Sequence, residues 1–306
     1  MTMPRLLSIG ITPSSEGDCA RLEAGLASMM RQDPSLAIVT NGDEIIVAGI
    51  GELQLEIVID RLKREFNVNA RLGRPSVIYA ETITATAVAE VKYADLSSHQ
   101  YAHVKIRIEP CDPGTGYVFA DEVTGGAVPS AFVAAVDAGV RSELEHGILT
   151  GHRVVDVRVV LYDGSYHDTD SSDAAFRVAA ARAFREAALR AAPVVLEPVM
   201  RVDASVPSWD VDKVTENLAA RRGRAYSIPK CDDYCTVVAY APLSALWGYS
   251  SDLRQITAGK GSFTMRFAAY APVQEAGGDP DPDAIVGAPL RPRPSPRSSA
   301  IELPEP

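Results

Sequence analysis

The chain has 306 residues, enough for two or three domains, and its hydrophobic fraction of 46% and charged fraction of 23% are typical of globular proteins. No uncharged apolar stretch approaches the roughly 18–20 residues that a membrane-spanning helix needs. The formal net charge of −10 argues against a protein that coats nucleic acid through a general basic field. Any contact with RNA must therefore come from a few placed residues.

Residues 1–79 are predicted to form a first α+β domain. The predicted elements in chain order are strand 6–11, a helix over residues 19–29, strands 36–39 and 44–48 around the turn Asn41-Gly42, a helix over residues 53–66 and strand 68–72. The second helix carries Leu53 and Ile57 among its periodic apolar residues. The order β-α-β-β-α-β is that of a ferredoxin-like sandwich.

Residues 80–197 show a different pattern. The predicted elements are strands 83–91 and 104–109, a helix after Pro129 with an apolar stripe of Val133, Val136, Val140 and Leu144, a strand over residues 154–162 and an alanine-rich helix that ends at residue 192. Asp170 is the expected N-cap of the last helix, and Asp173 in its first turn is favoured by the helix dipole.

The β-α-β-β-α-β order recurs in residues 198–274. The predicted elements are strand 198–206, a helix over residues 210–222 with Gly223 at its C-cap, strands 224–228 and 236–240, a helix over residues 243–257 and strand 262–269. The remaining residues, 275–306, are rich in proline, serine and arginine without periodicity, which predicts a disordered tail.

Several stretches resemble translation elongation factor G, and they follow one another along the chain in the order of that family. The longest is residues 163–172 (Asp-Gly-Ser-Tyr-His-Asp-Thr-Asp-Ser-Ser), which is similar to a segment of the fourth domain of that family. The other stretches are residues 49–53 with 60–68 in the third domain, residues 196–200 at the junction into the fifth, and residues 221–223, 246–249, 252–254 and 257–261 in the fifth. The resemblance covers roughly residues 5–270.

The resemblance implies three linked α+β domains: two ferredoxin-like sandwiches that flank a left-handed β-α-β domain of the ribosomal-protein type. In the family these domains form the ribosome-binding body that acts in translocation, with the middle domain in the decoding site. The implied partners are the ribosome, through ribosomal RNA and the decoding site with its transfer RNA and messenger RNA, and a separate chain that carries the GTPase domain. No membrane partner is implied. The four cysteines, taken as reduced thiols, favour the cytoplasm.

A phosphate-binding loop of the form G-x-x-x-x-G-K-[ST] is absent from the sequence. The segment Gly259-Lys260-Gly261-Ser262 lacks the upstream glycine and precedes a predicted strand rather than a helix. We therefore expect this chain to lack GTPase activity of its own, with no catalytic residue, no GTP or Mg²⁺ cofactor and no metal site.

Two loops of the middle domain carry the candidate RNA-binding residues. In the first loop the resemblance places Ser165, Tyr166, His167 and Asp168 at the decoding site. An imidazole such as that of His167 can stack on a base or hydrogen-bond a phosphate or 2′-hydroxyl group, although a histidine that caps local backbone is the alternative. The second loop, residues 97–103, contains His99 and Gln100. Gln100 aligns with a family glutamine near the codon and anticodon, but the loop lacks the arginine and glycines of the family, so a loop without function is the alternative.

Basic residues supply further candidates. By resemblance, the tentative ribosomal RNA contacts in the last domain are Arg221, Arg222, Arg254 and Lys260, and ion pairing within the fold is an equal alternative. On the alanine-rich helix, a solvated face competes with a stripe along RNA phosphates; its arginines are Arg177, Arg182, Arg185 and Arg190.

Two other functions remain open. A ribosome-protection or antibiotic self-resistance factor derived from elongation factor G would share these domains, and the altered loop over residues 96–101 favours it. A small-molecule kinase would use the middle fold. Against the kinase, Gly114-Thr115-Gly116 precedes strand-like residues 117–119, where a phosphate loop should precede a helix.

Overall fold

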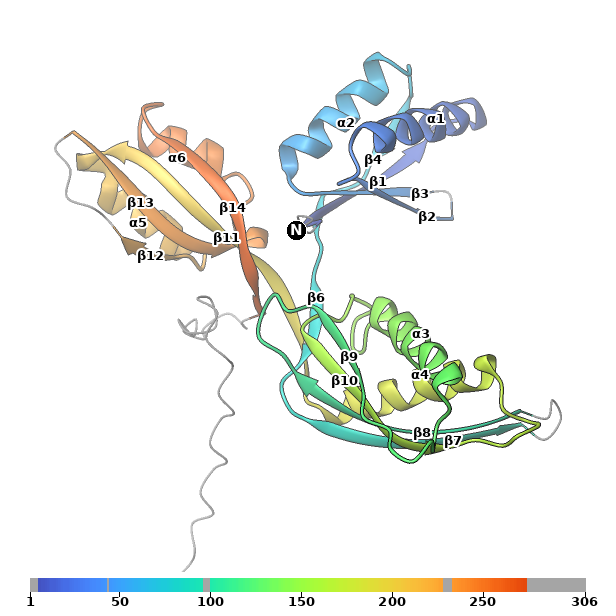
Figure 1. Ribbon diagram of the computed structural model, residues 1–306. Helices are drawn as coiled ribbons and strands as arrows, with labels where there is room; N and C mark the ends of the chain where they lie inside the picture. The colour runs from blue at the N-terminus through green and yellow to red at the C-terminus, as the bar shows by residue number, and fades with distance from the viewer. Residues whose placement is uncertain (1–4, 43, 96–99, 228–232, 274–306) are drawn as a thin grey trace, which may run out of the picture. The chain divides into compact units, whose positions relative to one another are not determined.

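The computed structural model describes residues 5–42, 44–95, 100–227 and 233–273 (Figure 1). They divide into two compact units, of which the first comprises residues 5–80 and 195–273 and the second comprises residues 81–194. The mixed α+β class is as predicted. The predicted disordered tail, residues 275–306, lies outside the described residues.

The N-terminal sheet of the first unit has two helices on one of its faces (Figure 1). Its elements are β1 (Leu7–Pro13), α1 (Glu16–Gln32), β2 (Ala37–Asn41), β3 (Glu44–Gly49), α2 (Glu52–Arg64), β4 (Ala70–Leu72) and the short β5 (Ser76–Val77). The strands lie in the order β2-β3-β1-β4 with antiparallel pairing, and β5 also pairs with β1. The predicted order β-α-β-β-α-β is therefore present.

Asp18 joins the start of α1 to the chain before β4. The Ser15 side chain caps α1 by accepting a hydrogen bond from the Asp18 backbone, and its hydroxyl donates to the Asp18 carboxylate at 2.6 Å. That carboxylate also accepts hydrogen bonds from the Asn69 backbone at 2.8 Å and from Arg21 at 2.7 Å. The hydrogen bonds from Ser15, Asn69 and Arg21 lower the pKa of Asp18 to about 2.

On α2, the burial differs from the prediction. Leu55, Val58 and Leu62 face the core, whereas Leu53 is 70% exposed and Ile57 is 51% exposed. Including Leu53 and Ile57 in the apolar face of this helix was therefore wrong.

The C-terminal sheet of the first unit repeats the same element order. Its elements are β11 (Pro193–Pro207), the 3-10 turn η1 (Ser208–Asp210), α5 (Val211–Ala220), β12 (Arg224–Ser227), β13 (Tyr234–Pro242), the 3-10 turn η2 (Leu243–Ala245), α6 (Tyr249–Ile256) and β14 (Ser262–Pro272). The strand order β12-β13-β11-β14 is equivalent to that of the first sheet.

Two local predictions in this sheet are wrong. The predicted helix over residues 243–257 is interrupted, because Gly248 adopts a left-handed conformation with φ of 73° between η2 and α6. At the end of α5, the left-handed residue is Arg222, with φ of 59°, rather than Gly223. Glycine is needed at position 223 for another reason: a Cβ there would lie 2.7 Å from the Leu218 carbonyl oxygen.

Cys235 is disulfide-bonded, so the expectation of four reduced thiols does not hold at this residue.

The second unit is built on a four-stranded sheet in the order β7-β8-β10-β9. Its elements are β6 (Ala80–Ile83), which pairs with β11, then β7 (Ala87–Asp95), β8 (Gln100–Pro110), β9 (Tyr117–Asp121), α3 (Ser130–His146), β10 (Val157–Ser165) and α4 (Asp173–Arg190). Strands β9 and β10 are parallel and joined through α3, which makes a β-α-β unit, whereas the pairs β7–β8 and β8–β10 are antiparallel.

The alanine-rich helix α4 packs closely against α3. Its buried residues are six alanines and two phenylalanines, and Phe176 stacks on Phe132 of α3 with ring centroids 4.6 Å apart. At Gly139 of α3, an added Cβ would collide with the Arg177 carbonyl oxygen. The small residues on both helices therefore allow their backbones to approach each other.

Three boundaries in this unit differ from the prediction. The expected strand over residues 83–91 is divided into β6 and β7. The N-cap of α4 is Ser172, whose hydroxyl accepts from the Ala175 backbone at 3.2 Å, so the prediction of Asp170 was wrong. Residues 100–103, expected in a loop, begin strand β8.

Glu81 is fully buried beside the loop that follows α3. Its carboxylate accepts hydrogen bonds from that loop; the donors are the backbone nitrogens of Ile148, Leu149, Thr150 and His152 and the Thr150 hydroxyl, at 2.5–3.1 Å. Burial alone would raise the pKa of Glu81, but the hydrogen bonds outweigh it and hold the pKa at about 2. This side chain therefore organises the loop as an ionised carboxylate.

Candidate RNA-binding site

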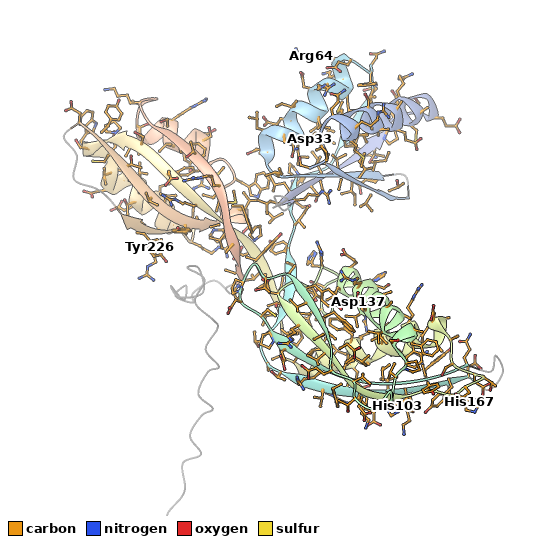
Figure 2. The ribbon with its side chains drawn as sticks, viewed as in Figure 1. Asp33, Arg64, His103, Asp137, His167 and Tyr226 are labelled. Carbon is orange, nitrogen blue, oxygen red and sulfur yellow. The ribbon has the colours of Figure 1, made fainter. Side chains whose placement is uncertain are left out.

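Three strands of the second unit run to the end at which the sequence-predicted residues gather. Strand β7 ends at Asp95, which pairs with Gln100 at the start of β8, and β10 ends at Ser165, which pairs with His103. The chain then forms a loop of residues 166–172, here called the tip loop, before α4 begins. Figure 2 shows His167 at this end of the sheet.

His167 lies in the tip loop with its side chain 58% exposed. Its Nδ1 atom is 3.1 Å from the Thr169 hydroxyl and 3.3 Å from the Asp170 carboxylate. Its backbone nitrogen donates to the Ser171 hydroxyl at 2.9 Å. Local contacts thus orient His167 while more than half of its side chain remains accessible.

The other predicted residues of this segment divide into two groups. Tyr166 is 44% exposed and Asp168 is also exposed, so both accompany His167 at the surface. Ser165 instead ends strand β10 and is half-buried, with its hydroxyl 2.8 Å from the Tyr101 hydroxyl and 3.0 Å from His103 Nδ1. Gln100 is half-buried at the first position of β8. His99 lies outside the described residues.

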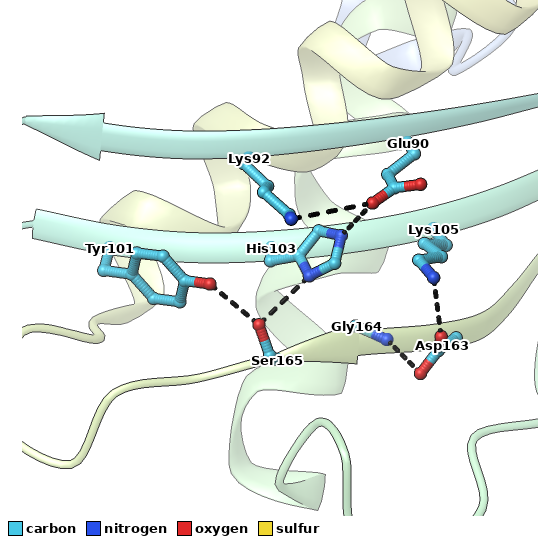
Figure 3. Close-up of polar contacts among 8 residues, drawn as sticks. All are labelled: Glu90, Lys92, Tyr101, His103, Lys105, Asp163, Gly164 and Ser165. Atoms are coloured by element: carbon cyan, nitrogen blue, oxygen red, sulfur yellow. Dashed lines mark hydrogen bonds and ion pairs between the residues drawn. The ribbon is translucent and has the colours of Figure 1, made fainter.

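Two residues at this site were missed as functional candidates. His103 is 7% exposed, and Glu90 on β7 contacts its Nε2 atom at 2.9 Å (Figure 3). The available signal was a histidine between Ala102 and Val104 in a segment that alternates like a strand, where a polar residue must find a partner if it is buried.

Charged side chains near His103 form an ion pair. Lys105 Nζ lies 3.0 Å from the Asp163 carboxylate, and this contact, with the Gly164 backbone, lowers the pKa of Asp163 (Figure 3). Gly164 is required by close packing, since an added Cβ would collide with the His103 carbonyl oxygen. The end of β10 is therefore held tightly against β8.

In the C-terminal sheet, the candidate basic residues also divide into two groups. Arg221 donates to the Ala245 and Trp247 carbonyl oxygens at 2.6 and 2.9 Å, and its Nη2 atom lies 2.6 Å from Asp252. Arg222 forms a bidentate pair with buried Glu197 at 2.7 and 3.1 Å. These contacts within the domain match the alternative of internal ion pairing.

Arg254 and Lys260, by contrast, are exposed. The Lys260 Nζ atom lies 5.5 Å from the ring centroid of Trp209, which is itself 64% exposed. These three side chains offer cationic and aromatic groups at the surface.

The arginines of α4 mostly have partners of their own. Arg185 pairs with Glu143 at 3.5 Å, Arg190 pairs with Glu186 at 2.6 Å, and Arg182 lies over the Tyr93 ring. This arrangement is that of a solvated, ion-paired helix face.

The three sheets correspond to three family models in chain order. Residues 3–74 match the model of elongation factor G domain III, residues 75–192 match that of elongation factor G domain IV, and residues 194–278 match that of the elongation factor G C-terminus. No helix in the described ranges is long and apolar enough to cross a membrane.

Among solved structures, the chain is similar to the crystal structure of a protein from Thermus thermophilus. The two are 33% identical, with a TM-score of 0.70 over 88% of this chain and 41% of that chain. The chain thus spans less than half the length of that protein. On the three consecutive domain matches, the chain belongs to the elongation factor G family and contains its domains III, IV and C-terminal domain.

Proposed function

We propose that this chain binds the ribosome during translation and that the second unit reaches the decoding site. The observation that carries the proposal is the exposed His167, held by hydrogen bonds in a loop at one end of a unit that matches domain IV. The partners are then ribosomal RNA and the decoding site with its transfer RNA and messenger RNA. The cytoplasm, where ribosomes act, is the proposed location.

The chemistry of the tip loop supports RNA recognition. The His167 imidazole can hydrogen-bond a phosphate or a 2′-hydroxyl group, and the exposed Tyr166 ring can stack on an unpaired base. Gln100 and His99, from the adjacent strand and the preceding segment, are proposed as secondary contacts. Asp168 would orient a ribose hydroxyl or a bound water rather than contact a phosphate, because like charges repel.

In the C-terminal domain, Arg254 and Lys260 are the proposed contacts with ribosomal RNA. Arg221 and Arg222 are better assigned to internal structure, because each already forms several contacts within the domain. The strand orders support ferredoxin-like folds for both sheets of the first unit. We also propose that the β-α-β connection in the second unit is left-handed. The chain is further proposed to act with a GTPase domain on a separate chain, and its own domains to bind no GTP, Mg²⁺ or other cofactor.

Ribosome binding can be tested by co-sedimentation of the full chain with 70S ribosomes at low and high salt. We expect binding that weakens as salt rises, because a chain with a net charge of −10 must rely on a few phosphate contacts. Absence of the chain from the ribosome pellet at every salt concentration would overturn the proposal.

The role of His167 can be tested by chemical footprinting of decoding-site RNA. Replacing His167 with alanine should weaken protection by the equivalent of about 1–3 kcal/mol, since one hydrogen bond or stacking contact is lost. His146→Ala is the matched control, because His146 is an exposed histidine of the same unit on α3. Equal footprints for the two variants would contradict RNA contact by His167.

A further inference from the structure

Four polar side chains from three strands meet where the tip loop begins (Figure 3). They are Glu90 of β7, Tyr101 and His103 of β8, and Ser165 of β10. His103 Nε2 is 2.9 Å from Glu90 Oε1, His103 Nδ1 is 3.0 Å from Ser165 Oγ, and the Tyr101 hydroxyl is 2.8 Å from the same Ser165 oxygen. Both nitrogens of this nearly buried imidazole are therefore engaged, which fixes the orientation of its ring.

The partners also define an order of donors. A carboxylate accepts hydrogen bonds, so in the tautomer that suits Glu90 the Nε2 atom of His103 carries the hydrogen and donates it. Nδ1 must then accept, which makes the Ser165 hydroxyl the donor to it. The Ser165 oxygen in turn accepts from the Tyr101 hydroxyl. Each hydrogen of this chain has an acceptor, as a buried polar network requires.

Tyr101 continues the connection into the tip loop through its backbone. Its nitrogen donates to the Asp170 carbonyl oxygen at 2.8 Å, and its carbonyl oxygen accepts from the Ser171 hydroxyl at 2.8 Å. That hydroxyl accepts from the His167 backbone at 2.9 Å, and the Ser171 nitrogen donates to the His167 carbonyl oxygen at 3.1 Å. The tip loop therefore follows Ser165 directly, and Asp170 and Ser171 hydrogen-bond it to the Tyr101 backbone.

We propose that Glu90, Tyr101, His103 and Ser165 form a clamp that positions the tip loop, with His103 as the positioning residue for His167. His103 holds the Ser165 hydroxyl, and Ser165 holds the Tyr101 ring whose backbone binds the loop. Without the imidazole, the Ser165 hydroxyl and the Glu90 carboxylate both lose a partner, and Tyr101 loses its anchored neighbour. Positioning is a property of the chain alone, while its effect on RNA rests on the proposed function.

Other charged groups flank the clamp but do not replace it. Lys92 on β7 lies 4.0 Å from the Glu90 carboxylate, and Lys105 on β8 pairs with Asp163 on β10. Lys92 can therefore remain beside Glu90 when His103 is altered, but neither lysine is paired with Ser165. Among these side chains, the His103 imidazole is the one that links Glu90 of β7 to Ser165 of β10.

Amide hydrogen exchange in the full chain tests the clamp without the ribosome. In His103→Ala, the amides of Tyr101, His167 and Ser171 should exchange about three- to tenfold faster, the effect of losing roughly one hydrogen bond. His103→Asn should restore slow exchange, because its amide oxygen can take the place of Nδ1 and accept from Ser165. His103→Gln can reach only Glu90, so it should behave like the alanine variant.

The controls separate positioning of the loop from general stability. Exchange at Ile106 and Val159, in the buried parts of β8 and β10, should stay unchanged in His103→Ala. Equal acceleration at these core amides would overturn the clamp, since His103 would then only stabilise the sheet. Loop exchange equal to that of the control His146→Ala would overturn it as well.

Footprinting of decoding-site RNA separates the clamp from the proposed function. If the clamp presents His167 to RNA, protection should fall in His103→Ala and return in His103→Asn. If loop exchange rises while the footprint stays that of the unmodified chain, the clamp stands and the proposed RNA contact by His167 fails.

Discussion

Glu81 of the second unit and Glu197 of the C-terminal sheet are both buried, yet they are satisfied in different ways. Glu81 accepts hydrogen bonds only from neutral groups, which belong to the loop after α3. Glu197 accepts two bonds from the Arg222 guanidinium and one from the Ser244 hydroxyl at 2.9 Å. The first carboxylate organises backbone, whereas the second engages a cationic side chain.

The difference shows why an arginine in a family-like stretch is not by itself an RNA contact. A buried carboxylate needs compensation, and the nearest suitable donors provide it. Near Glu81 those donors are backbone amides, so no cation is needed. Near Glu197 the donor is Arg222, whose guanidinium is therefore engaged within the domain, while Arg254 and Lys260 are exposed at the surface.

The largest effect is expected from Glu81→Ala. Several donors of one loop would lose a shared acceptor, so we expect the second unit to lose about 3–5 kcal/mol of unfolding free energy. Urea denaturation, with unfolding detected through residues of this unit, measures the unfolding free energy. Glu145→Ala is the control, because the Glu145 side chain is 64% exposed in its pair with Arg153. A loss no larger than that of the control would contradict the role of Glu81.

Acid should produce the next largest effect. The pKa of Glu81 is about 2 in the folded state, below its usual range in an unfolded chain, so its contribution to stability is complete above the unfolded pKa and is lost as the pH falls through the folded pKa. Between pH 5 and pH 2 this amounts to about 3 kcal/mol. The stability difference between the unmodified chain and Glu81→Gln should shrink over this range. A difference independent of pH would show that Glu81 is not held ionised.

Arg222→Ala should be somewhat less costly, at about 2–3 kcal/mol for the C-terminal domain. It leaves Glu197 buried without its cation, but the Arg222 side chain is 37% exposed, so water can reach part of the site. Adding Glu197→Gln should recover part of the loss, because a neutral amide is less costly to bury than an unpaired charge. Thermal unfolding of the single and double variants measures this coupling, and strictly additive losses would contradict it.

The smallest effects on stability are expected at the surface. Arg254→Ala, Lys260→Ala and His167→Ala should each stay within about 0.5 kcal/mol of the unmodified chain. On the ribosome, Arg254→Ala and Lys260→Ala should each lower the dependence of log binding constant on log salt by about one, the effect of one lost phosphate contact. Co-sedimentation over a salt series measures the slope. Unchanged slopes in both variants would remove the C-terminal domain from the proposed RNA contacts.

Much of the fold could be predicted from the sequence because its signals are local. Asn41-Gly42 correctly predicted a hairpin between β2 and β3, although Asn41 itself ends β2 and pairs with Glu44. The helices α1 and α3 follow from apolar periodicity before Asp33-Pro34 and after Pro129. Periodicity failed for the helix over residues 243–257, because a continuous apolar pattern does not reveal that Gly248 adopts a left-handed conformation.

The candidate site was less predictable because its contacts are distant in sequence. His103 and Ser165 are paired across strands β8 and β10, and a shift of one residue in that register would turn His103 to the other face of the sheet. Arg222 and Glu197 likewise meet only because the fold brings the turn between α5 and β12 beside β11. Resemblance singled out residues 163–172, but only the structure separates the exposed His167 from the half-buried Ser165.

The alanine-rich face of α4 has a mechanical consequence. Alanine has no rotamers, so the seam between α3 and α4 cannot absorb a displacement by rearranging its six buried alanines. The tip loop leads directly into this helix at Ser172, and its 18 residues span about 27 Å at the usual rise of about 1.5 Å per residue. A force applied at the tip loop would therefore displace α4 along its axis with little deformation. The displacement would reach Arg190 at the end of the helix, three residues before β11 begins.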